Sequence, residues 1–247
     1  MESKAPPTLP GQPMPTPRGP SPDPKDQARQ VVRSLVRLYP EVRCALDHRD
    51  AFELLVATVL SAQCTDERVN QVTPALFARY PGPAAMAEAD PTEVEALVYR
   101  TGFFRAKARN LIGLAKILVE KHGGAVPAEI GALTALPGVG RKTAHVVLGN
   151  AFGVASGVVV DTHVKRLAFR LGLTDRTEPE VIERELSGLV PRKHWIDFSH
   201  RLIAHGRGPC GALRPRCGEC PLSLICPRRG VRPAADAGSP PRTTRPG

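Results

Sequence analysis

Apolar residues recur at helical spacing along most of this chain, and residues that begin or end helices bound each periodic segment. Strand-like runs of Val and Ile are almost missing: Gly157-Val-Val-Val160 is short and leads directly into a helix start. This pattern predicts an all-α fold. A length of 247 residues is enough for one large domain or two small ones around a substantial core.

The boundary signals place most of the expected helices. Asp50 and Glu53 form a capping box before a segment that is apolar nearly all round, which predicts a helix inside the core. The other helices are expected over residues 28–38, from Asp90-Pro91 onward, over 105–121 up to Gly123-Gly124, over 164–171, from Thr177 with Glu180 onward, and from Trp195 to just before Gly206.

The hairpin Leu136-Pro-Gly-Val-Gly-Arg-Lys-Thr143 joins a glycine turn to a candidate nucleophile. Gly138 and Gly140 allow the backbone to turn tightly and to bring N–H groups close to an anion. The next segment reads as a helix, whose positive end adds to that attraction, and Lys142 lies in its first turn. The alternative is a structural turn followed by a solvated lysine. A nucleotide-binding P-loop is excluded, because only one residue separates the two glycines.

A second segment, Val160-Asp-Thr-His-Val-Lys-Arg166, places a carboxylate at a helix start. Aspartate is favoured there because it caps free backbone N–H groups, and taken alone Asp161 reads first as a cap. A carboxylate held rigidly at this place is also suited to polarising a reacting group in a cleft. His163 is expected to be a structural histidine.

Four cysteines near the end of the chain have the spacing Cys210-x6-Cys217-x2-Cys220-x5-Cys226. Four thiolates this close in sequence predict one metal centre with tetrahedral sulfur geometry. Ligand chemistry alone leaves zinc and an iron–sulfur cluster equally acceptable. Arg214 and Arg216 lie between the first two cysteines, so a metal centre would present two cations in a fixed loop.

The charge balance favours a polyanionic partner. Lys and Arg number 34 against 24 Asp and Glu, which gives +10 and a pI near 9.7. Most of this excess lies between the proline-rich residues 1–24 and the Arg/Pro-rich tail from 231, both of which read as disordered arms. Nucleic acid is the first expectation and an anionic membrane surface the second. The chain shows no signal peptide and no membrane-spanning run, so a cytoplasmic location is expected, where clustered cysteines indicate metal binding.

In order and spacing, the hairpin, the Asp161 segment and the four cysteines resemble the endonuclease III family of DNA repair glycosylases, as does Leu60-Ser-Ala-Gln-Cys-Thr-Asp66. The resemblance covers roughly residues 25–230. It implies two helical domains that flank a DNA-binding cleft, with a six-helix barrel over 44–154 that carries the helix–hairpin–helix motif. The second domain combines 25–43 with 155–230, and its four cysteines are expected to hold a 4Fe–4S cluster instead of zinc.

The same resemblance implies a DNA N-glycosylase that is also a DNA-(apurinic or apyrimidinic site) lyase. Such enzymes remove oxidised pyrimidines, for example thymine glycol, from duplex DNA and then cut the abasic strand. Lys142 is expected to attack the sugar and form a Schiff base, and Asp161 to stabilise the positive charge that develops there. The chain is expected to act as a monomer on damaged double-stranded DNA, at the nucleoid if the cell is prokaryotic, and not on a membrane.

The resemblance also assigns DNA contacts. Gly138 and Gly140 are expected to hold phosphates through backbone N–H groups, with further phosphate contacts from Arg214 and Arg216. Gln63 matches the position that fills the gap left by the extruded nucleotide.

Two positions depart from the family pattern. Phe103 stands where the family carries a wedge that is usually aliphatic, and its alternative role is a hydrophobic staple for the following helix. His145 stands where close relatives often have asparagine.

Two other functions fit parts of the pattern. One is an adenine or mismatch glycosylase built on the same helices; such relatives usually lack the hairpin lysine, and adenine-specific ones carry an additional C-terminal domain. The other is a non-catalytic DNA-binding or redox-sensing iron–sulfur module. Lys142 and the short segment after Cys226 argue against the first, and Lys142 together with Asp161 disfavours the second.

Overall fold

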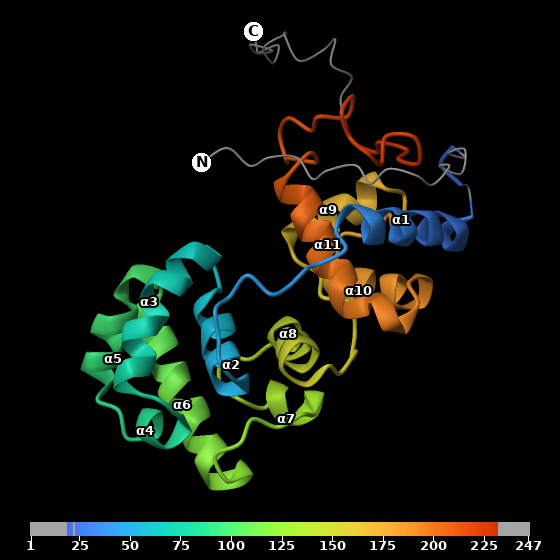
Figure 1. Ribbon diagram of the computed structural model, residues 1–247. Coiled ribbons are helices and arrows are strands. Elements are labelled where there is room, and N and C mark those ends of the chain that lie inside the picture. Colours follow the sequence, from blue (N-terminus) through green and yellow to red (C-terminus); the bar gives the residue numbers. More distant parts are fainter. Residues whose placement is uncertain (1–18, 22, 232–247) are drawn as a thin grey trace, which may run out of the picture.

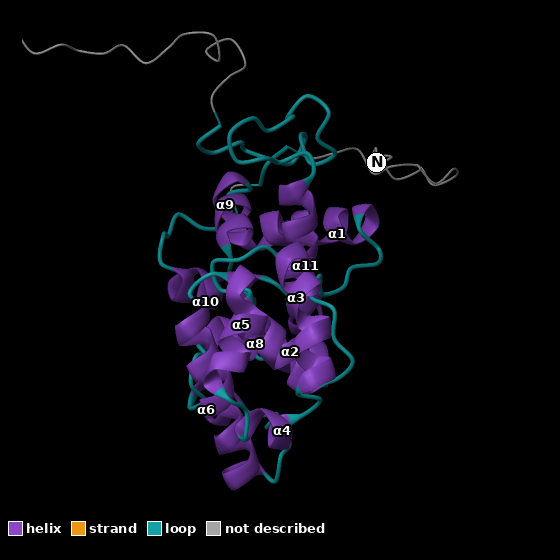
Figure 2. Ribbon diagram, turned by 90° about the vertical axis from the view of Figure 1, so that its left-hand side faces the viewer, coloured by secondary structure: helices purple, strands orange, loops and turns teal. Residues whose placement is uncertain are grey.

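The computed structural model describes residues 19–21 and 23–231; the predicted arms at 1–24 and 231–247 lie almost wholly outside the described residues. Within that part of the chain every regular element is a helix, as the sequence predicts (Figure 2). The elements are α1 (Pro24–Leu38), α2 (Ala51–Leu60), α3 (Asp66–Arg79), α4 (Pro83–Ala87), α5 (Pro91–Val98), η1 (Tyr99–Thr101), α6 (Phe104–His122), α7 (Ile130–Thr134), α8 (Arg141–Phe152), α9 (Thr162–Arg170), α10 (Pro179–Leu189), η2 (Arg192–His194) and α11 (Trp195–Arg207).

The helices form two lobes, each with its own hydrophobic core (Figure 1). Helices α2 to α8 enclose the first core. The second core is built from α1, α9, α10 and α11, together with Leu222 and Ile225 of the cysteine segment, residues 208–231. The chain therefore begins in the second lobe, builds the first, and returns to complete the second.

Helix α2 lies inside the first lobe, as its apolar sequence predicts. Every residue from Phe52 to Leu60 is buried, and each fully buried large aliphatic side chain stabilises the fold by about 1.5–3 kcal/mol. The predicted cap is present, since an Asp50 carboxylate oxygen accepts a hydrogen bond from the backbone N–H of Glu53 at 2.9 Å. The Glu53 carboxylate in turn accepts from the backbone N–H of Arg49 at 2.7 Å. These two hydrogen bonds fix where α2 starts. Helix α8 packs along α2.

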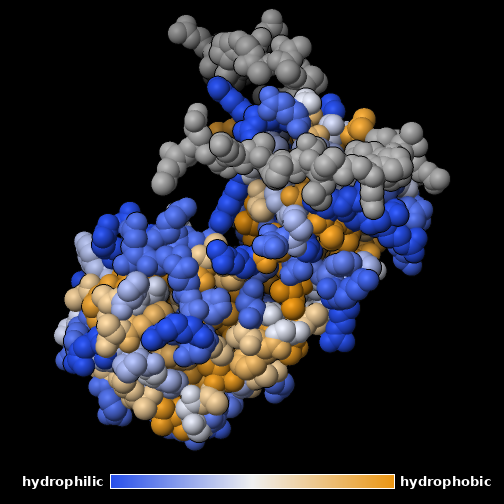
Figure 3. Space-filling view, viewed as in Figure 1, coloured by the Kyte–Doolittle hydropathy of each residue, from blue (hydrophilic) through white to orange (hydrophobic). Residues whose placement is uncertain are grey.

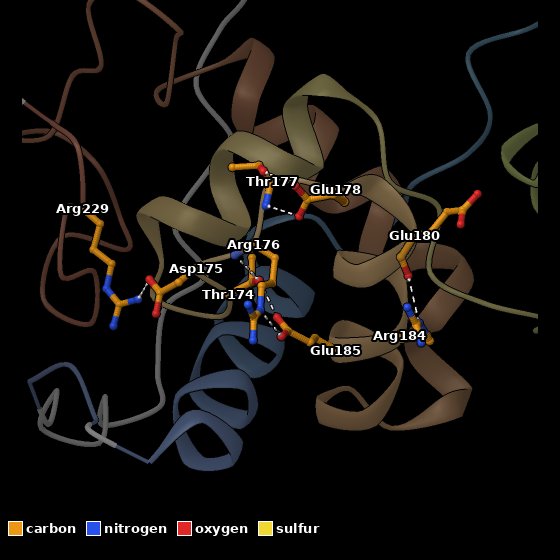
Figure 4. Close-up of polar contacts among 9 residues, drawn as sticks. All are labelled: Thr174, Asp175, Arg176, Thr177, Glu178, Glu180, Arg184, Glu185 and Arg229. Carbon is orange, nitrogen blue, oxygen red and sulfur yellow. Dashed lines mark hydrogen bonds and ion pairs between the residues drawn. The ribbon is translucent and has the colours of Figure 1, made fainter.

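Helix α10 begins one residue later than the sequence pattern predicts. Thr177 does not cap it: its hydroxyl donates to the Glu178 carboxylate at 2.7 Å (Figure 4). Glu178 takes the N-cap position without a side-chain hydrogen bond to the helix, and Pro179 is the first helical residue. Proline is favoured there because its missing N–H is not needed and its φ is already helical, so Pro179 determines the start. Helix α11 likewise runs to Arg207, past its predicted end before Gly206.

Polar contacts join the two lobes. His200 Nε2 of α11 lies 2.9 Å from Asn150 Oδ1 of α8, and Arg207 donates to Asp66 of α3 at 2.6 Å. Within the second lobe, Arg229 pairs with Asp175 and closes the cysteine segment onto the loop between α9 and α10 (Figure 4). The lobes therefore meet at α8 and α11, next to the hairpin.

The surface of the first lobe is uneven in polarity. Its upper part is mainly hydrophilic, whereas its lower part exposes more hydrophobic residues (Figure 3).

In the part of the chain that the structure describes, no helix combines the length and the apolar character that crossing a membrane requires.

Candidate functional site

The hairpin connects α7 to α8 and exposes its two glycines. Leu136 and Val139 are buried and anchor the turn, while Gly138 and Gly140 face solvent. Gly138 has φ +76°, and a Cβ there would lie 2.7 Å from the Asn110 amide nitrogen, so its backbone needs glycine. Gly140 differs from the expectation: its φ of −89° is ordinary, and a Cβ there would meet no atom within 4 Å. Its contribution is an unobstructed approach to the start of α8.

Lys142 lies in the first turn of α8, immediately after this open approach, and its side chain is exposed. Gly140 is the N-cap residue and supplies no side-chain hydrogen bond, so the first N–H groups of α8 keep no side-chain cap. Unpaired N–H groups and the positive helix end together attract an anion. Lys142 therefore presents an exposed amine beside a turn that is suited to binding an anion.

Arg141 and His145 of α8 share one carboxylate in the other lobe. Glu183 Oε1 of α10 lies 2.9 Å from Arg141 Nη2 and 3.0 Å from His145 Nε2. The second His145 nitrogen contacts the Ser156 hydroxyl at 2.7 Å, and burial lowers the pKa of this histidine. His145 thus places a buried imidazole between α8 and α10, where it ties the hairpin helix to the second lobe.

Asp161 is the N-cap of α9, which confirms its predicted structural role. One carboxylate oxygen accepts a hydrogen bond from the backbone N–H of Val164 at 2.8 Å. No other hydrogen bond to this carboxylate is formed by the described residues, and the side chain is half-buried. His163 contacts Arg166 at 3.1 Å, and burial lowers its pKa, as fits a structural histidine. Asp161 therefore keeps one oxygen available while it caps α9.

Lys142 and Asp161 stand at the starts of consecutive helices, one in each lobe. No hydrogen bond or ion pair joins these two side chains in the described part of the chain. A substrate sugar between the lobes would have to bridge them.

Gln63 and Phe103 both lie in exposed turns with unusual backbone geometry. Gln63 follows α2 with φ 55°, and Phe103 precedes α6 with φ 47°. Among non-glycine described residues, only Arg228 shares a positive φ with them. Such strain is costly for a side-chain-bearing residue and clusters at functional sites.

The staple alternative for Phe103 is wrong. Its side chain is 66 % exposed, and its residue is the N-cap of α6 itself. The packing role belongs to its neighbour Phe104, which lies against the first core with its ring centroid 4.9 Å from that of Tyr99. The Phe103 ring is thus left projecting into solvent.

The four cysteines Cys210, Cys217, Cys220 and Cys226 line a common cavity in the second lobe. Burial raises the pKa of Cys220 to about 11 and also raises that of Cys226. In the described chain no three His, Cys, Asp or Glu side chains converge closely enough to hold a single metal ion.

Two residues that the sequence reasoning missed contact these sulfurs. Arg170 of α9 donates to Cys210 Sγ at 3.4 Å, and His205 Nε2 of α11 lies 3.4 Å from Cys220 Sγ. The other His205 nitrogen contacts the Tyr39 hydroxyl at 3.0 Å, and burial lowers the His205 pKa to about 4. A histidine five residues before the first cysteine was the available signal; for Arg170 the sequence offers none.

Arg214 and Arg216 are exposed in the cysteine segment, as expected. Arg216 lies 3.6 Å from Glu219, but both side chains are largely in solvent, where such a pair is weak. Both guanidinium groups therefore remain accessible to an anionic partner.

Comparison with known proteins identifies relatives across most of the chain. Residues 56–192 match the family described as HhH-GPD superfamily base excision DNA repair protein. Endonuclease III of Synechocystis sp. is 54 % identical over 203 residues, which cover 82 % of this chain and 93 % of that protein.

Solved structures agree with the sequence matches. A non-covalent endonuclease III–DNA complex is 41 % identical with a TM-score of 0.79, and the match covers 83 % of this chain and 95 % of the solved one. A trapped endonuclease III–DNA covalent intermediate gives the same identity and TM-score, with 83 % and 96 % covered. The chain therefore belongs to the endonuclease III family, within the HhH-GPD superfamily of base excision DNA repair proteins.

Proposed function

We propose that this protein is a bifunctional DNA glycosylase and abasic-site lyase that removes oxidised pyrimidines of the thymine glycol type from duplex DNA. The observation that carries the proposal is the exposed amine of Lys142 in the first turn of α8, directly behind the glycine hairpin. That a relative has been trapped as a covalent intermediate with DNA supports chemistry through a covalent bond. The protein is proposed to act as a monomer on damaged double-stranded DNA in the cytoplasm, at the nucleoid in a prokaryotic cell.

In the first step, the bond between C1′ and the damaged base is replaced by a bond between C1′ and the Lys142 nitrogen. The damaged nucleotide leaves the stack, which is easier for a damaged base than for an intact one. The neutral Lys142 amine attacks C1′ of the sugar, the bond from C1′ to the base breaks, and the base departs with that bonding pair and takes up a proton. The free Asp161 oxygen stabilises the positive charge that develops on the sugar.

The second step cuts the strand. The sugar ring opens and the lysine nitrogen forms a Schiff base with C1′. The cationic imine acidifies the C2′ proton, so a base removes it and the electron pair expels the 3′ phosphate by β-elimination. Water then hydrolyses the imine and returns Lys142 to its free form.

Binding is divided between docking and insertion. The N–H groups at Gly138, Gly140 and the start of α8 hold phosphates without reading sequence. Gln63 fills the gap left by the extruded nucleotide, and the exposed Phe103 ring enters the stack as a wedge. Their left-handed backbones support this assignment, because strain of this kind persists only where function or surroundings require it.

We propose that Cys210, Cys217, Cys220 and Cys226 hold a 4Fe–4S cluster. All four cysteines line one cavity, which supports a shared centre, and membership of the endonuclease III family favours the cluster over zinc. When bound, the cluster supplies four iron–thiolate bonds that crosslink the cysteine segment. Arg170 and His205 orient the sulfurs, as outer contacts of metal ligands do.

Metal analysis tests this assignment. Purified protein is expected to be yellow-brown, with broad visible absorption and about four iron atoms per chain. Replacing Cys217 by Ser is expected to lower the iron content, since a cluster of this type needs all four thiolates. A colourless, fully active preparation with one zinc per chain would contradict the assignment.

The salt dependence of binding tests the docking surface. With about four to six phosphates neutralised, log affinity is expected to fall with log salt at a slope near −4 to −5. Replacing both Arg214 and Arg216 by Ala is expected to make the slope shallower by up to about two, with the trapped fraction at saturating enzyme unchanged. An unchanged slope would show that the DNA-docking surface lies elsewhere.

The two lobes support a division of the chain into two domains. We propose a six-helix barrel domain over residues 44–154, which contains the first core, and a cluster domain formed by 25–43 with 155–230, which contains the second. The substrate is proposed to bind between them, because Lys142 and Asp161 belong to different domains.

A set of duplexes, each with one modified site, tests the function as a whole. Strand cleavage is expected at thymine glycol and at an abasic site, with an unsaturated sugar on the 3′ end. Adenine opposite an oxidised guanine and thymine opposite guanine are expected to remain intact, which separates this function from the adenine and mismatch glycosylases. Binding to every duplex without release of a base would favour the non-catalytic DNA-binding module instead.

A further inference from the structure

Lys107 is a buried cation in the first lobe. It lies in α6, only 4 % of the residue is exposed, and no Asp or Glu of the described chain pairs with it. Burial lowers its pKa. An unpaired buried ammonium is expensive unless polar groups replace its water. Its Nζ donates to two backbone carbonyls, that of Leu60 at 2.8 Å and that of Thr101 at 2.7 Å.

Both acceptors terminate helices. Leu60 is the last residue of α2, and Thr101 is the last residue of η1. Terminal carbonyls lack a partner within their own helix and carry the negative end of its dipole. One ammonium therefore caps two helices at once, which accounts for its burial without a carboxylate.

Each capped helix runs directly into one of the two turns assigned to DNA insertion. Gln63 follows Leu60 by three residues, and Phe103 follows Thr101 by two. Both are left-handed, at φ 55° and 47°. Conformations of this kind are unfavourable for residues with a side chain and need support from their surroundings. Lys107 is a direct link between the backbones that precede both strained residues.

We propose that Lys107 is a positioning residue that holds the Gln63 turn and the Phe103 turn in register, so that both enter the DNA stack together. This inference rests on the proposed insertion roles of Gln63 and Phe103. Its basis is geometric: the two turns are separate in sequence, and the ammonium fixes the distance between the helix ends from which they project. Without Lys107 each turn still forms, but the distance between the two turns is no longer fixed so as to match the spacing of the bases.

The test compares two substrates that differ in their need for insertion. One is a duplex with a single abasic site; the other carries a one-nucleotide gap in the complementary strand opposite that site, so no opposing base must be separated. Lys107→Met keeps the length of the side chain and removes the charge and the donors. It is expected to lower kcat/KM on the intact duplex by about 10- to 100-fold, as a misplacement of about 1 Å does, and to leave cleavage of the gapped duplex near wild type.

Control variants separate positioning from general destabilisation. Thr58→Val removes one buried bond, from the Thr58 hydroxyl to the Leu54 carbonyl at 2.7 Å, in the same α2 helix. It is expected to leave unchanged the intact-to-gapped ratio, which is kcat/KM on the intact duplex divided by kcat/KM on the gapped duplex. Lys107→Gln retains an uncharged donor and is expected to lower the ratio by a smaller factor than Met, which decides the question if the Met variant does not fold.

The Gln63→Ala, Phe103→Ala double variant provides the reference. It is expected to lower the same ratio, and adding Lys107→Met to it is expected to lower the ratio no further, because the three act through one step. Equal losses on both substrates for the Lys107 variants, or a further drop in the triple variant, would overturn the positioning role. An unchanged ratio in the double variant would instead overturn the insertion roles of Gln63 and Phe103, on which the proposal rests.

Discussion

Replacing Lys142 by Gln is expected to abolish borohydride trapping on DNA that contains thymine glycol or an abasic site. Borohydride reduces a Schiff base to a stable amine, and the amide of Gln cannot form one. Strand cleavage is expected to fall by more than about 1,000-fold, as when other enzymes lose their nucleophile. The covalent complex is measured by gel electrophoresis after denaturation.

Binding separates loss of the nucleophile from loss of the site. The variant is expected to bind the damaged duplex nearly as well as wild type, because the hairpin glycines and the start of α8 are unchanged. Lys165 offers a matched control, since it is an exposed lysine in the first turns of the neighbouring helix α9. Lys165→Gln is expected to be trapped normally. Trapping of Lys142→Gln at the wild-type rate would remove Lys142 from the mechanism.

Replacing Asp161 by Asn is expected to separate its two roles. An Asn side chain caps helices about as well as Asp, so the free energy of unfolding is expected to change by less than about 1 kcal/mol. Catalysis is expected to fall by about 100-fold or more, because a neutral amide does not stabilise developing positive charge as a carboxylate does. Single-turnover cleavage and urea unfolding of the same preparations measure the two effects.

Asp90 provides the comparison for this experiment. It caps α5 in the first lobe, where it accepts from the backbone N–H of Thr92 at 2.7 Å. Asp90→Asn is expected to change stability by a similar amount and to leave cleavage unchanged. If Asp161→Asn also turned over at the wild-type rate, Asp161 would be a cap alone.

The helices with strong boundary signals could be predicted from the sequence. The capping box at Asp50 and the glycines after α6 act through local backbone geometry, so neighbouring residues suffice to specify them. Helix α3 was not predicted because it is largely polar and contains Pro74. Helices α4 and α7 have five residues each, which is too short to show a period.

The site was predictable where it depends on residue type and spacing, and not where it depends on packing. Lys142 after the hairpin and Asp161 before α9 are local patterns, and both lie where the sequence indicates. The left-handed turns at Gln63 and Phe103 were not foreseeable, because a non-glycine residue adopts that conformation only when distant groups stabilise it. Lys107, 47 residues from its acceptor Leu60, is such a distant group.

The exposed ring of Phe103 has a thermodynamic consequence for lesion recognition. Water around an aromatic surface is released only when the proposed wedge enters the stack, and that release gives a negative heat-capacity change. The proposed phosphate docking by Arg214 and Arg216 would release counterions instead and bury little apolar surface. The two stages of recognition thus respond to different variables. Ionic strength is expected to change the affinity for DNA in general, whereas temperature is expected to change the additional affinity for the damaged site.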